Sequence, residues 1–334
     1  MKKVSLALVG AGEAAQNFHL PALSNIDAVE INAICDKNFS LARAVAERYG
    51  IPHVFRDIHE LLAHNSIDAV DICTSTDAHA EVALASVEAG KHVFIEKPIA
   101  RNLAETISIA EAADKQAIKA MVGMNHRFRP DAIMLKNFVA KGEIGEIFYA
   151  KAGWLQQKRT KAWVEQADKS GGGVLFDLGI TMIDSILWIF DFLPLQSVQA
   201  SVFHHLTNNV EDVCVGHLRF VNGSIATFET RCTLFSPRTN FHFDVHGRKG
   251  GVTVNPSMMP KSAGVKYSPV PDVYIKNDVT ILRKSFEGEL KHFINSVKGI
   301  VPVISTTKEA VARMKVIEAL YRSAKEGREI VPEN

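Results

Sequence analysis

The sequence predicts an α/β protein with an N-terminal, doubly wound parallel sheet and a C-terminal α+β domain that has an open, mostly antiparallel sheet. Apolar strands alternate with helices through the first 124 residues, which is typical of parallel sheets. A glycine turn directly follows the first apolar run. Beyond Met124, strand patterns follow one another, which is typical of antiparallel pairing. We therefore expect a first domain over 1–124 and a second over 125–334, whose last helix can pack back on the first domain.

Composition excludes several classes of protein. The net charge is +1 over 334 residues, so there is no electrostatic reason to expect nucleic acid or a membrane surface as a partner. The cysteines form no Cys-x-x-Cys pair, which indicates buried thiols in a reducing compartment, the cytoplasm, and no metal site. We expect no run long enough to span a membrane, and we interpret the apolar N-terminus as a strand, since Gly10 and Gly12 would interrupt a signal peptide.

The first strand, 4–9, leads into Gly10-Ala11-Gly12-Glu13-Ala14-Ala15. This is the Gly-x-Gly-x-x-Ala form of the dinucleotide fingerprint. The first glycine permits a tight turn, the second lets the backbone approach a pyrophosphate, and the alanine lets the helix pack closely. The helix N-terminus then offers free N–H groups to the phosphates. We expect Gly10, Gly12, Glu13 and Ala14 to bind the cofactor.

Asp36 closes the second strand, 29–35, and lies 21 positions beyond Ala15, near the spacing of the ribose-binding acid. Its carboxylate can accept the ribose hydroxyls and would repel a 2′-phosphate, which favours NAD over NADP. Lys37 could host that phosphate, so NADP stays possible. An alternative role for Asp36 is to cap the helix over 39–49, and both roles can coexist.

A short buried strand, 93–95, ends in Glu96-Lys97-Pro98. Pro98 cannot continue a ladder, so the two charges lie at the carboxyl end of a strand, where open α/β sheets bind ligands. A lysine there can act as an acid or base; the alternative is a surface turn with a Glu-Lys pair.

Thr74 and Ser75 follow the strand over 69–73 and lie either beside the cofactor path or at the cap of the next helix. His79, in the first turn of that helix, fits packing better than catalysis.

In the second domain, a helix over 174–190 carries Asp177, Thr181 and Asp184 at i, i+4 and i+7, which places them on one face. Asp177 and Asp184 could be acids on the surface of the helix. The apolar surroundings instead favour a buried site at Asp177 and a structural role for Asp184. Asn222-Gly223 predicts a hairpin, and Thr306 with Glu309 predicts a capping box.

These segments together resemble the Gfo/Idh/MocA oxidoreductase family, named after glucose-fructose oxidoreductase and inositol dehydrogenase. The resemblance covers nearly the whole chain. Its motifs are Gly10-Ala11-Gly12, His19-Leu20-Pro21-Ala22-Leu23, the run from Ala89 to Pro98, the run from Gly171 to Gly179, and Val210-Glu211-Asp212. It implies a Rossmann domain followed by a substrate domain whose sheet forms homodimers or homotetramers.

The resemblance also implies residue roles. Gly10 and Gly12 would hold the pyrophosphate and Asp36 the adenosine ribose. Lys97 would touch the nicotinamide ribose and the reacting hydroxyl. The remaining expected cofactor contacts are Thr74, Ser75, His79, Glu96 and Asn125. The expected substrate contacts are Lys97, Arg127, Trp163, Asp177 and Thr181.

One position departs from the family pattern Asp-x-Gly-x-His, because Thr181 replaces the histidine that usually serves as the general acid/base. Threonine cannot exchange a proton near neutral pH. Either Lys97 performs the transfer with Asp177, or another residue does, or the chain binds dinucleotide without turnover. The catalytic residues we expect are Lys97, Asp177 and Thr181.

The function we expect is NAD(P)-dependent hydride transfer to or from a sugar, polyol or related hydroxy or keto compound, with Lys97 as the proton-transfer group. The alternatives are a dinucleotide-binding sensor without turnover and an NAD-dependent glycosidase.

Overall fold

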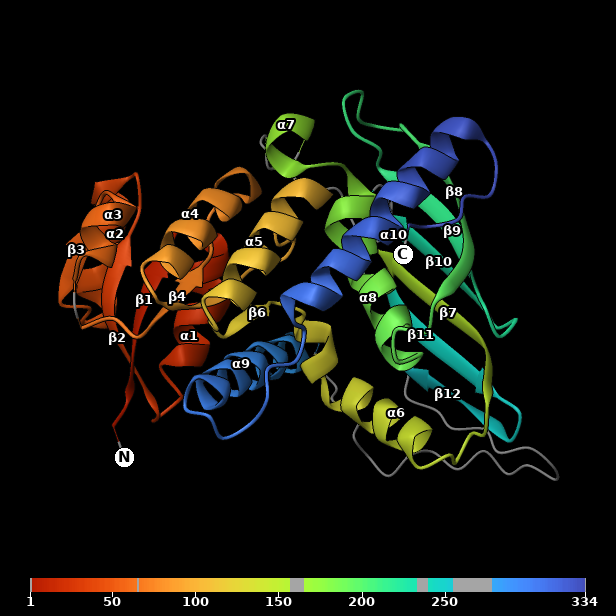
Figure 1. The fold of residues 1–334 in the computed structure, drawn as a ribbon, viewed down its shortest axis with the longest axis horizontal. Coiled ribbons are helices and arrows are strands. Elements are labelled where there is room, and N and C mark those ends of the chain that lie inside the picture. The colour runs from red at the N-terminus through yellow and green to blue at the C-terminus, as the bar shows by residue number, and fades with distance from the viewer. Residues whose placement is uncertain (1, 65, 157–164, 233–239, 255–277, 334) are drawn as a thin grey trace. The chain divides into compact units, whose positions relative to one another are not determined.

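The computed structural model describes residues 2–64, 66–156, 165–232, 240–254 and 278–333. The chain forms two compact units (Figure 1). The first unit comprises Met1–Phe128 and Val279–Val311, and the second comprises Arg129–Asp278 and Ala312–Asn334. The expected division at residue 124 thus differs from the structure chiefly in 279–311, which joins the first unit rather than the second.

The first unit contains a six-stranded sheet in the order β3-β2-β1-β4-β5-β6, and every pair is parallel. This confirms the predicted doubly wound sheet. The strand order reverses between β1 and β4, the place where such sheets bind ligands. The strands are β1 (Val4–Val9), β2 (Val29–Cys35), β3 (His53–Phe55), β4 (Ala69–Ile72), β5 (His92–Ile95) and β6 (Ala120–Val122).

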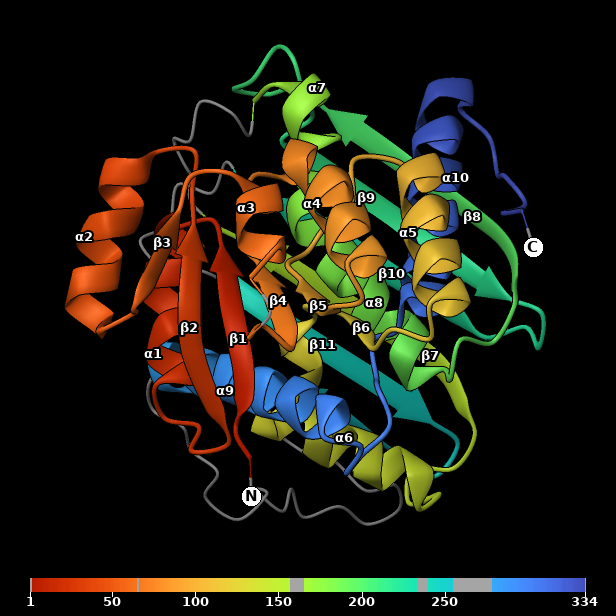
Figure 2. The same ribbon diagram turned by 60° about the vertical axis from the view of Figure 1, so that its left-hand side comes forward.

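Helices alternate with these strands as expected, and α4 and α5 pack side by side (Figure 2). The cap of α2 is Asn38, whose side chain accepts the Leu41 N–H at 3.2 Å. The suggestion that Asp36 caps this helix is therefore wrong. The helices are η1 (Ala15–His19), α1 (Leu20–Leu23), α2 (Phe39–Tyr49), α3 (Ile58–Leu62), α4 (Thr76–Glu88), α5 (Leu103–Lys115) and η2 (Asn125–Phe128).

Helix α9 (Asp278–Val297) completes the core of the first unit. Its Leu290 and Phe293 belong to one buried cluster with Leu6 of β1 and Phe94 of β5. Burial of such side chains contributes about 1.5–3 kcal/mol each. This apolar packing is the physical reason that the segment joins the first unit, and both ribbon views show α9 beside α1 (Figures 1 and 2).

The second unit contains a sheet in the order β12-β11-β7-β10-β9-β8. Of its described pairs only β7–β10 is parallel, which confirms the mostly antiparallel prediction. The strands are β7 (Ile147–Leu155), β8 (Leu195–Phe203), β9 (Val213–Phe220), β10 (Ile225–Arg231), β11 (Asn240–Gly247) and β12 (Gly250–Val254). The Asn222-Gly223 hairpin joins β9 to β10 as predicted.

Helix α8 (Ile180–Ile189) packs on β7 and β10. The other helices are α6 (Pro130–Ala140), α7 (Ala167–Ser170), η3 (Leu175–Gly179) and α10 (Thr307–Glu326). The predicted capping box at the start of α10 is confirmed, since Thr306 N–H donates to Glu309 Oε2 at 2.7 Å and Glu309 N–H donates to Thr306 Oγ1 at 3.2 Å.

One segment, Ala167–Ile189, is long and apolar enough to cross a membrane by length and composition alone. The expectation that no run has that length is therefore wrong. Because 89% of the apolar window is buried inside the fold, the segment has the surroundings of a core helix.

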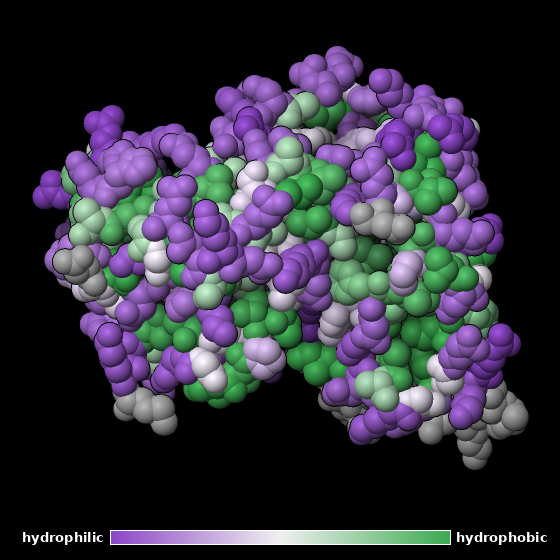
Figure 3. All heavy atoms as spheres, in the orientation of Figure 1, coloured by the Kyte–Doolittle hydropathy of each residue, from purple (hydrophilic) through white to green (hydrophobic). Residues whose placement is uncertain are grey.

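On the face in Figure 3, hydrophilic side chains cover much of the surface and hydrophobic side chains show between them. This mixture is expected where amphipathic helices turn their polar faces outward.

Candidate active site

The glycine turn has the conformation that a dinucleotide site requires. Gly10 has φ of +97°, and a Cβ there would lie 2.6 Å from the Cys73 carbonyl oxygen, so only glycine fits. A Cβ on Gly12 would meet no protein atom within 4 Å, so space remains for a close phosphate. These two positions fit the pyrophosphate of NAD. The half-buried Ala14 and exposed Glu13 follow directly.

Asp36 connects the end of β2 to this turn. Its Oδ2 accepts the Ala11 N–H at 2.7 Å, and its Oδ1 accepts the Asn38 N–H at 2.7 Å. Each carboxylate oxygen can accept more than one hydrogen bond, so the half-buried side chain retains acceptors for ribose hydroxyls. This position fits the adenosine ribose of NAD.

His79 lies in the first turn of α4, as predicted. Its ring is buried, with Nδ1 2.8 Å from the Pro98 carbonyl oxygen and Nε2 3.1 Å from the Thr74 carbonyl oxygen. Burial lowers its pKa, which favours the neutral ring. The ring therefore supports two loop backbones, in agreement with a packing role. The Thr74 hydroxyl donates to the Ser75 carbonyl and the Ser75 hydroxyl to the Asp77 carboxylate. Ser75 occupies the N-cap position of α4, but its side chain makes no capping hydrogen bond.

Glu96 and Lys97 lie just beyond β5, as predicted. Glu96 Oε2 accepts the Lys97 N–H at 2.9 Å, and Oε1 lies 3.1 Å from His19 Nε2. Burial alone would raise the pKa of Glu96, but the bond to His19 and the charges of His19 and Lys97 hold it below its usual value. The Lys97-Pro98 peptide bond is cis. A carboxylate thus holds the backbone of the candidate catalytic lysine.

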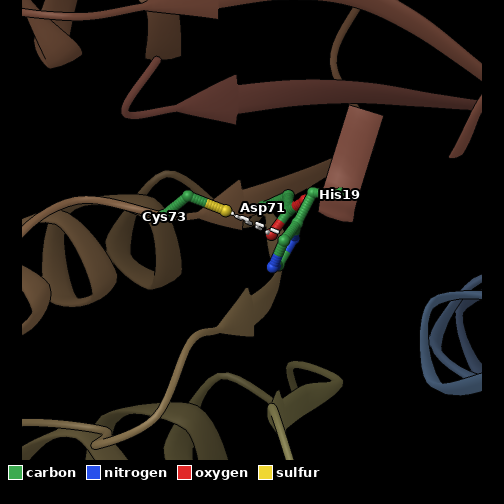
Figure 4. A group of neighbouring side chains, drawn as sticks. All are labelled: His19, Asp71 and Cys73. Carbon is green, nitrogen blue, oxygen red and sulfur yellow. Dashed lines mark hydrogen bonds and ion pairs between the residues drawn. The ribbon is translucent and has the colours of Figure 1, made fainter. Parts of the chain in front are cut away.

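Behind Glu96 lies a buried cluster that sequence reasoning missed. The side chains of His19, Asp71 and Cys73 point toward one another (Figure 4). His19 Nδ1 lies 2.9 Å from Asp71 Oδ2 and 3.2 Å from Cys73 Sγ. Burial alone would lower the pKa of His19, but the charge of Asp71 and the hydrogen bonds of the cluster outweigh it and raise the pKa well above its usual value. Such residues can bind zinc, yet here their polar atoms bond to one another.

Glu289, on α9, is a fourth buried group of this region. Both of its carboxyl oxygens are without a hydrogen-bond partner among the described residues. Burial, followed by the charge of Glu96, raises its pKa well above the usual value. Burial therefore favours the neutral acid over the carboxylate. Nothing in its helical pattern distinguished it from an ordinary surface glutamate.

Two further predicted site residues are engaged in internal contacts of the first unit. Asn125 Nδ2 donates to Ser285 Oγ at 3.0 Å. Arg127 is buried and pairs with Glu309, with 3.1 Å between Nη1 and Oε1. The predicted Trp163 lies outside the described residues.

The second unit contains a pocket that includes Asp177, as predicted. Its described lining also includes Gln156, Glu165, Gly173, Val174, Thr207, Val210, Glu211, Asp212 and Cys232. Four acids line this pocket, and carboxylate oxygens accept hydrogen bonds from hydroxyl groups: Glu165, Asp177, Glu211 and Asp212. This lining suits a polyhydroxylated ligand.

Glu211 holds the segment that leads to Asp177. Its carboxylate accepts the N–H groups of Gly173 and Leu175 at 3.1 and 2.9 Å, and the Tyr321 hydroxyl at 2.8 Å. Burial raises its pKa in spite of these bonds. Sequence reasoning gave Glu211 no role, although its Val-Glu-Asp motif was visible.

Thr181 is buried and is not among the described residues that line this pocket. Leu175–Gly179 forms a π turn instead of the regular α-helix that was expected, and the shared face of Asp177 and Thr181 stays a prediction. Asp184 instead forms a buried pair with Arg313, with 2.8 Å between Oδ1 and Nη1. This agrees with the structural role expected for it.

Family models match both units. Residues 4–124 match the model described as "Oxidoreductase family, NAD-binding Rossmann fold", and residues 133–253 match the "GFO/IDH/MocA C-terminal domain". The two matches together cover more than half of the chain, and they agree with the glycine turn and with the pocket.

The chain is also similar to individual curated proteins and to solved structures. The chain is similar to D-glucoside 3-dehydrogenase of Escherichia coli (strain K12), at 29% identity over 96% of this chain and 95% of that protein. It is also 28% identical to 1,5-anhydro-D-fructose reductase of Ensifer adhaerens over 77% of each chain. The solved structure of levoglucosan dehydrogenase in complex with NADH and L-sorbose superposes with a TM-score of 0.89 over 100% of both chains, at 22% identity, which supports the fold.

Proposed function

Because the chain belongs to the Gfo/Idh/MocA oxidoreductase family, with an NAD-binding Rossmann domain over residues 4–124, we propose that it oxidises a hydroxyl-bearing carbon of a sugar or polyol, or reduces the matching ketone. Bound NAD supplies the hydride chemistry. The substrate class is supported by the relatives named for D-glucosides and 1,5-anhydro-D-fructose and by the acid-lined pocket of the second unit.

Lys97 is the proton-transfer group in this proposal. The observation that carries it is the position of Lys97 at the carboxyl edge of the sheet, where Glu96 holds its backbone N–H at 2.9 Å. In oxidation, the amine of Lys97 takes the hydroxyl proton. In reduction, its ammonium donates that proton and stabilises the developing alkoxide charge. Asp177 binds substrate hydroxyls in its pocket, and Thr181 takes no part in proton transfer.

The test is reduced-nicotinamide absorbance with NAD or NADP and a panel of D-glucosides, levoglucosan, inositols and sugar acids; 1,5-anhydro-D-fructose is assayed with NADH. We expect Lys97→Met to lower kcat by about 10²–10⁴-fold while the dissociation constant of NADH stays nearly unchanged. The matched control is Lys91→Met, which removes a lysine just before β5 that bonds the Ile67 carbonyl. Turnover retained by Lys97→Met would overturn the assignment.

Two other results would favour the alternative functions. Tight NADH binding with no turnover on any substrate would favour a sensor. Product from a glycoside without net NADH would favour NAD-dependent glycoside cleavage, in which the hydride returns.

We also propose a cytoplasmic homo-oligomer that associates through the sheet of the second unit. Strand β9 alternates buried and accessible residues, and Val215 on its open face and Phe148 on β7 are 46% and 50% exposed. Light scattering that gives the mass of a monomer would overturn this proposal.

A further inference from the structure

A buried histidine links two strands of the parallel sheet behind the candidate catalytic lysine. His19, at the end of η1, has Nδ1 2.9 Å from Asp71 Oδ2 and Nε2 3.1 Å from Glu96 Oε1. The side chains of His19 and Asp71 are completely buried, and that of Glu96 is 14% exposed. The histidine is therefore enclosed, and of its two carboxylate partners in the described part of the chain Glu96 is the one with an exposed fraction.

The two contacts favour a ring that is protonated on both nitrogens. Ionised carboxylates only accept hydrogen bonds, and a histidine donates from both nitrogens only as an imidazolium. One positive ring between two carboxylates satisfies all three groups, and it reduces the cost of burying their charges. A neutral ring would leave one short nitrogen–oxygen contact without a proton.

The same chain of bonds continues to Lys97. Glu96 uses Oε1 for His19 and Oε2 for the Lys97 N–H, at 2.9 Å. A carboxylate held at both oxygens loses its side-chain rotation, so its position depends on His19. Asp71, His19, Glu96 and the Lys97 backbone thus form one connected series across the ends of β4 and β5.

We propose that His19 is a positioning residue: its imidazolium, anchored by Asp71, fixes the Glu96 carboxylate, and Glu96 in turn fixes the backbone of Lys97 at the reacting centre. This inference rests on the proposed role of Lys97 for its catalytic consequence, whereas its structural part does not. Small losses of position at a reacting group can lower rates by about 10²-fold, so a group that never touches substrate can control turnover.

Two neighbours in the same cluster provide matched controls. Cys73 Sγ contacts His19 Nδ1 at 3.2 Å and Asp71 Oδ1 at 3.5 Å, and no described hydrogen bond joins it to Glu96. Glu289 is buried beside the cluster, and neither of its oxygens bonds to Glu96 among the described residues. Cys73→Ala and Glu289→Gln therefore disturb the buried cluster and leave the His19–Glu96 bond in place.

The decisive readout is hydrogen exchange of the Lys97 backbone N–H in intact protein labelled with ¹⁵N-lysine; the Lys97→Met variant identifies its signal by removing it. We expect His19→Gln and Glu96→Gln each to speed this exchange by about 10-fold or more. Cys73→Ala and Glu289→Gln leave it within about 3-fold of the unmodified protein. Unchanged exchange in His19→Gln, or equal acceleration in all four variants, would overturn the proposal.

A double-variant cycle tests whether His19 acts on turnover through Glu96. With NADH and 1,5-anhydro-D-fructose, or another substrate turned over in the panel above, we expect His19→Gln to lower kcat by about 10–100-fold. In the Glu96→Gln background the same change should cost less than about 3-fold, because its effect passes through Glu96. Fully additive losses would show that His19 acts independently of Glu96 and would overturn the proposed order. If His19→Gln fails to fold, the Glu96→Gln variant, whose side chain is partly exposed, decides through the Lys97 exchange rate.

Two further outcomes separate the positioning role of His19 from the catalytic role of Lys97 and from metal binding. If Lys97→Met keeps full turnover, the proposed function fails, but accelerated Lys97 exchange in His19→Gln still supports the structural link. If the purified protein contains one equivalent of zinc that is lost in Cys73→Ala, the cluster is a metal site and the positioning proposal is overturned.

Discussion

Asp36 Oδ2 accepts a hydrogen bond from the backbone N–H of Ala11 at 2.7 Å. The acid that follows β2 and the glycine turn that follows β1 are therefore connected directly, although they are far apart in the sequence. One carboxylate both shapes the phosphate turn and offers acceptors to a ribose.

Replacing Asp36 should affect both the shape of the glycine turn and the binding of the ribose. We expect Asp36→Ala to raise the dissociation constant of NADH by about 10-fold or more, because it removes ribose acceptors and also the acceptor of the Ala11 N–H. Asp36→Asn keeps one acceptor oxygen and should lose less. Fluorescence titration with NADH and NADPH measures both affinities. Equal NADH binding by the two variants would contradict the double role.

The two glycines of the turn should respond differently to alanine. Gly10→Ala places a Cβ against the Cys73 carbonyl at positive φ, so we expect lower thermal stability, by about 1–2 kcal/mol from φ alone, and weak NADH binding. Gly12→Ala meets no protein atom, so it should fold normally and weaken NADH binding only. Melting temperatures and NADH titration distinguish these outcomes. A destabilised Gly12→Ala variant would show that the space is not free.

The buried acid Glu289 should make stability depend on pH. Its raised pKa means that the folded state retains a proton that the unfolded state releases near pH 4.3. This contribution to stability is fully present below that pH and is lost as pH rises toward the folded pKa. We therefore expect Glu289→Gln to gain melting temperature over the unmodified protein between pH 4 and 8. Glu287→Gln, on the same helix, supplies the background, and an equal trend in both would contradict the prediction.

The Asp184–Arg313 pair should be costly to break. Both side chains are at most 1% exposed, and removing one partner leaves the other charge buried, which costs about 3–5 kcal/mol. We expect Asp184→Asn to lower the free energy of unfolding in urea by that amount. The control is Glu146→Gln in the surface pair with Arg248, whose side chains are 60% and 71% exposed, where about 0–1 kcal/mol is expected. Similar losses in both variants would contradict the argument.

Local patterns were enough to predict most elements, because strand and helix periodicities are properties of short segments. Strands β1 and β2 and helix α2 begin and end where the sequence predicts. β3 has only three residues, too few for a periodic signal, and β12 contains two adjacent glycines. The assignment of α9 to the first unit depends on contacts with β1 and β5, which no local pattern contains.

Some residues of the candidate site could be predicted from local patterns, and others could not. The glycine turn, Asp36 and Lys97 follow strand ends, so their positions were predictable. The link from His19 to Asp71 joins residues 52 positions apart, and only the folded chain brings them together. The helix expected over 174–190 contains a π turn over Leu175–Gly179, which the sequence spacing does not distinguish from a regular α-helix.

The position of α9 has a consequence for the order in which the protein can fold during synthesis. The first unit needs Phe286, Leu290, Phe293 and Ile294 to cover the apolar residues of its own sheet, and the ribosome adds these after the strands of the second unit. Domains commonly fold as they emerge, N-terminal first. Here the apolar surface of the nascent dinucleotide domain stays uncovered until the strands of the second unit and α9 have been made. A gene fragment that ends near residue 128 should accordingly yield an aggregation-prone product.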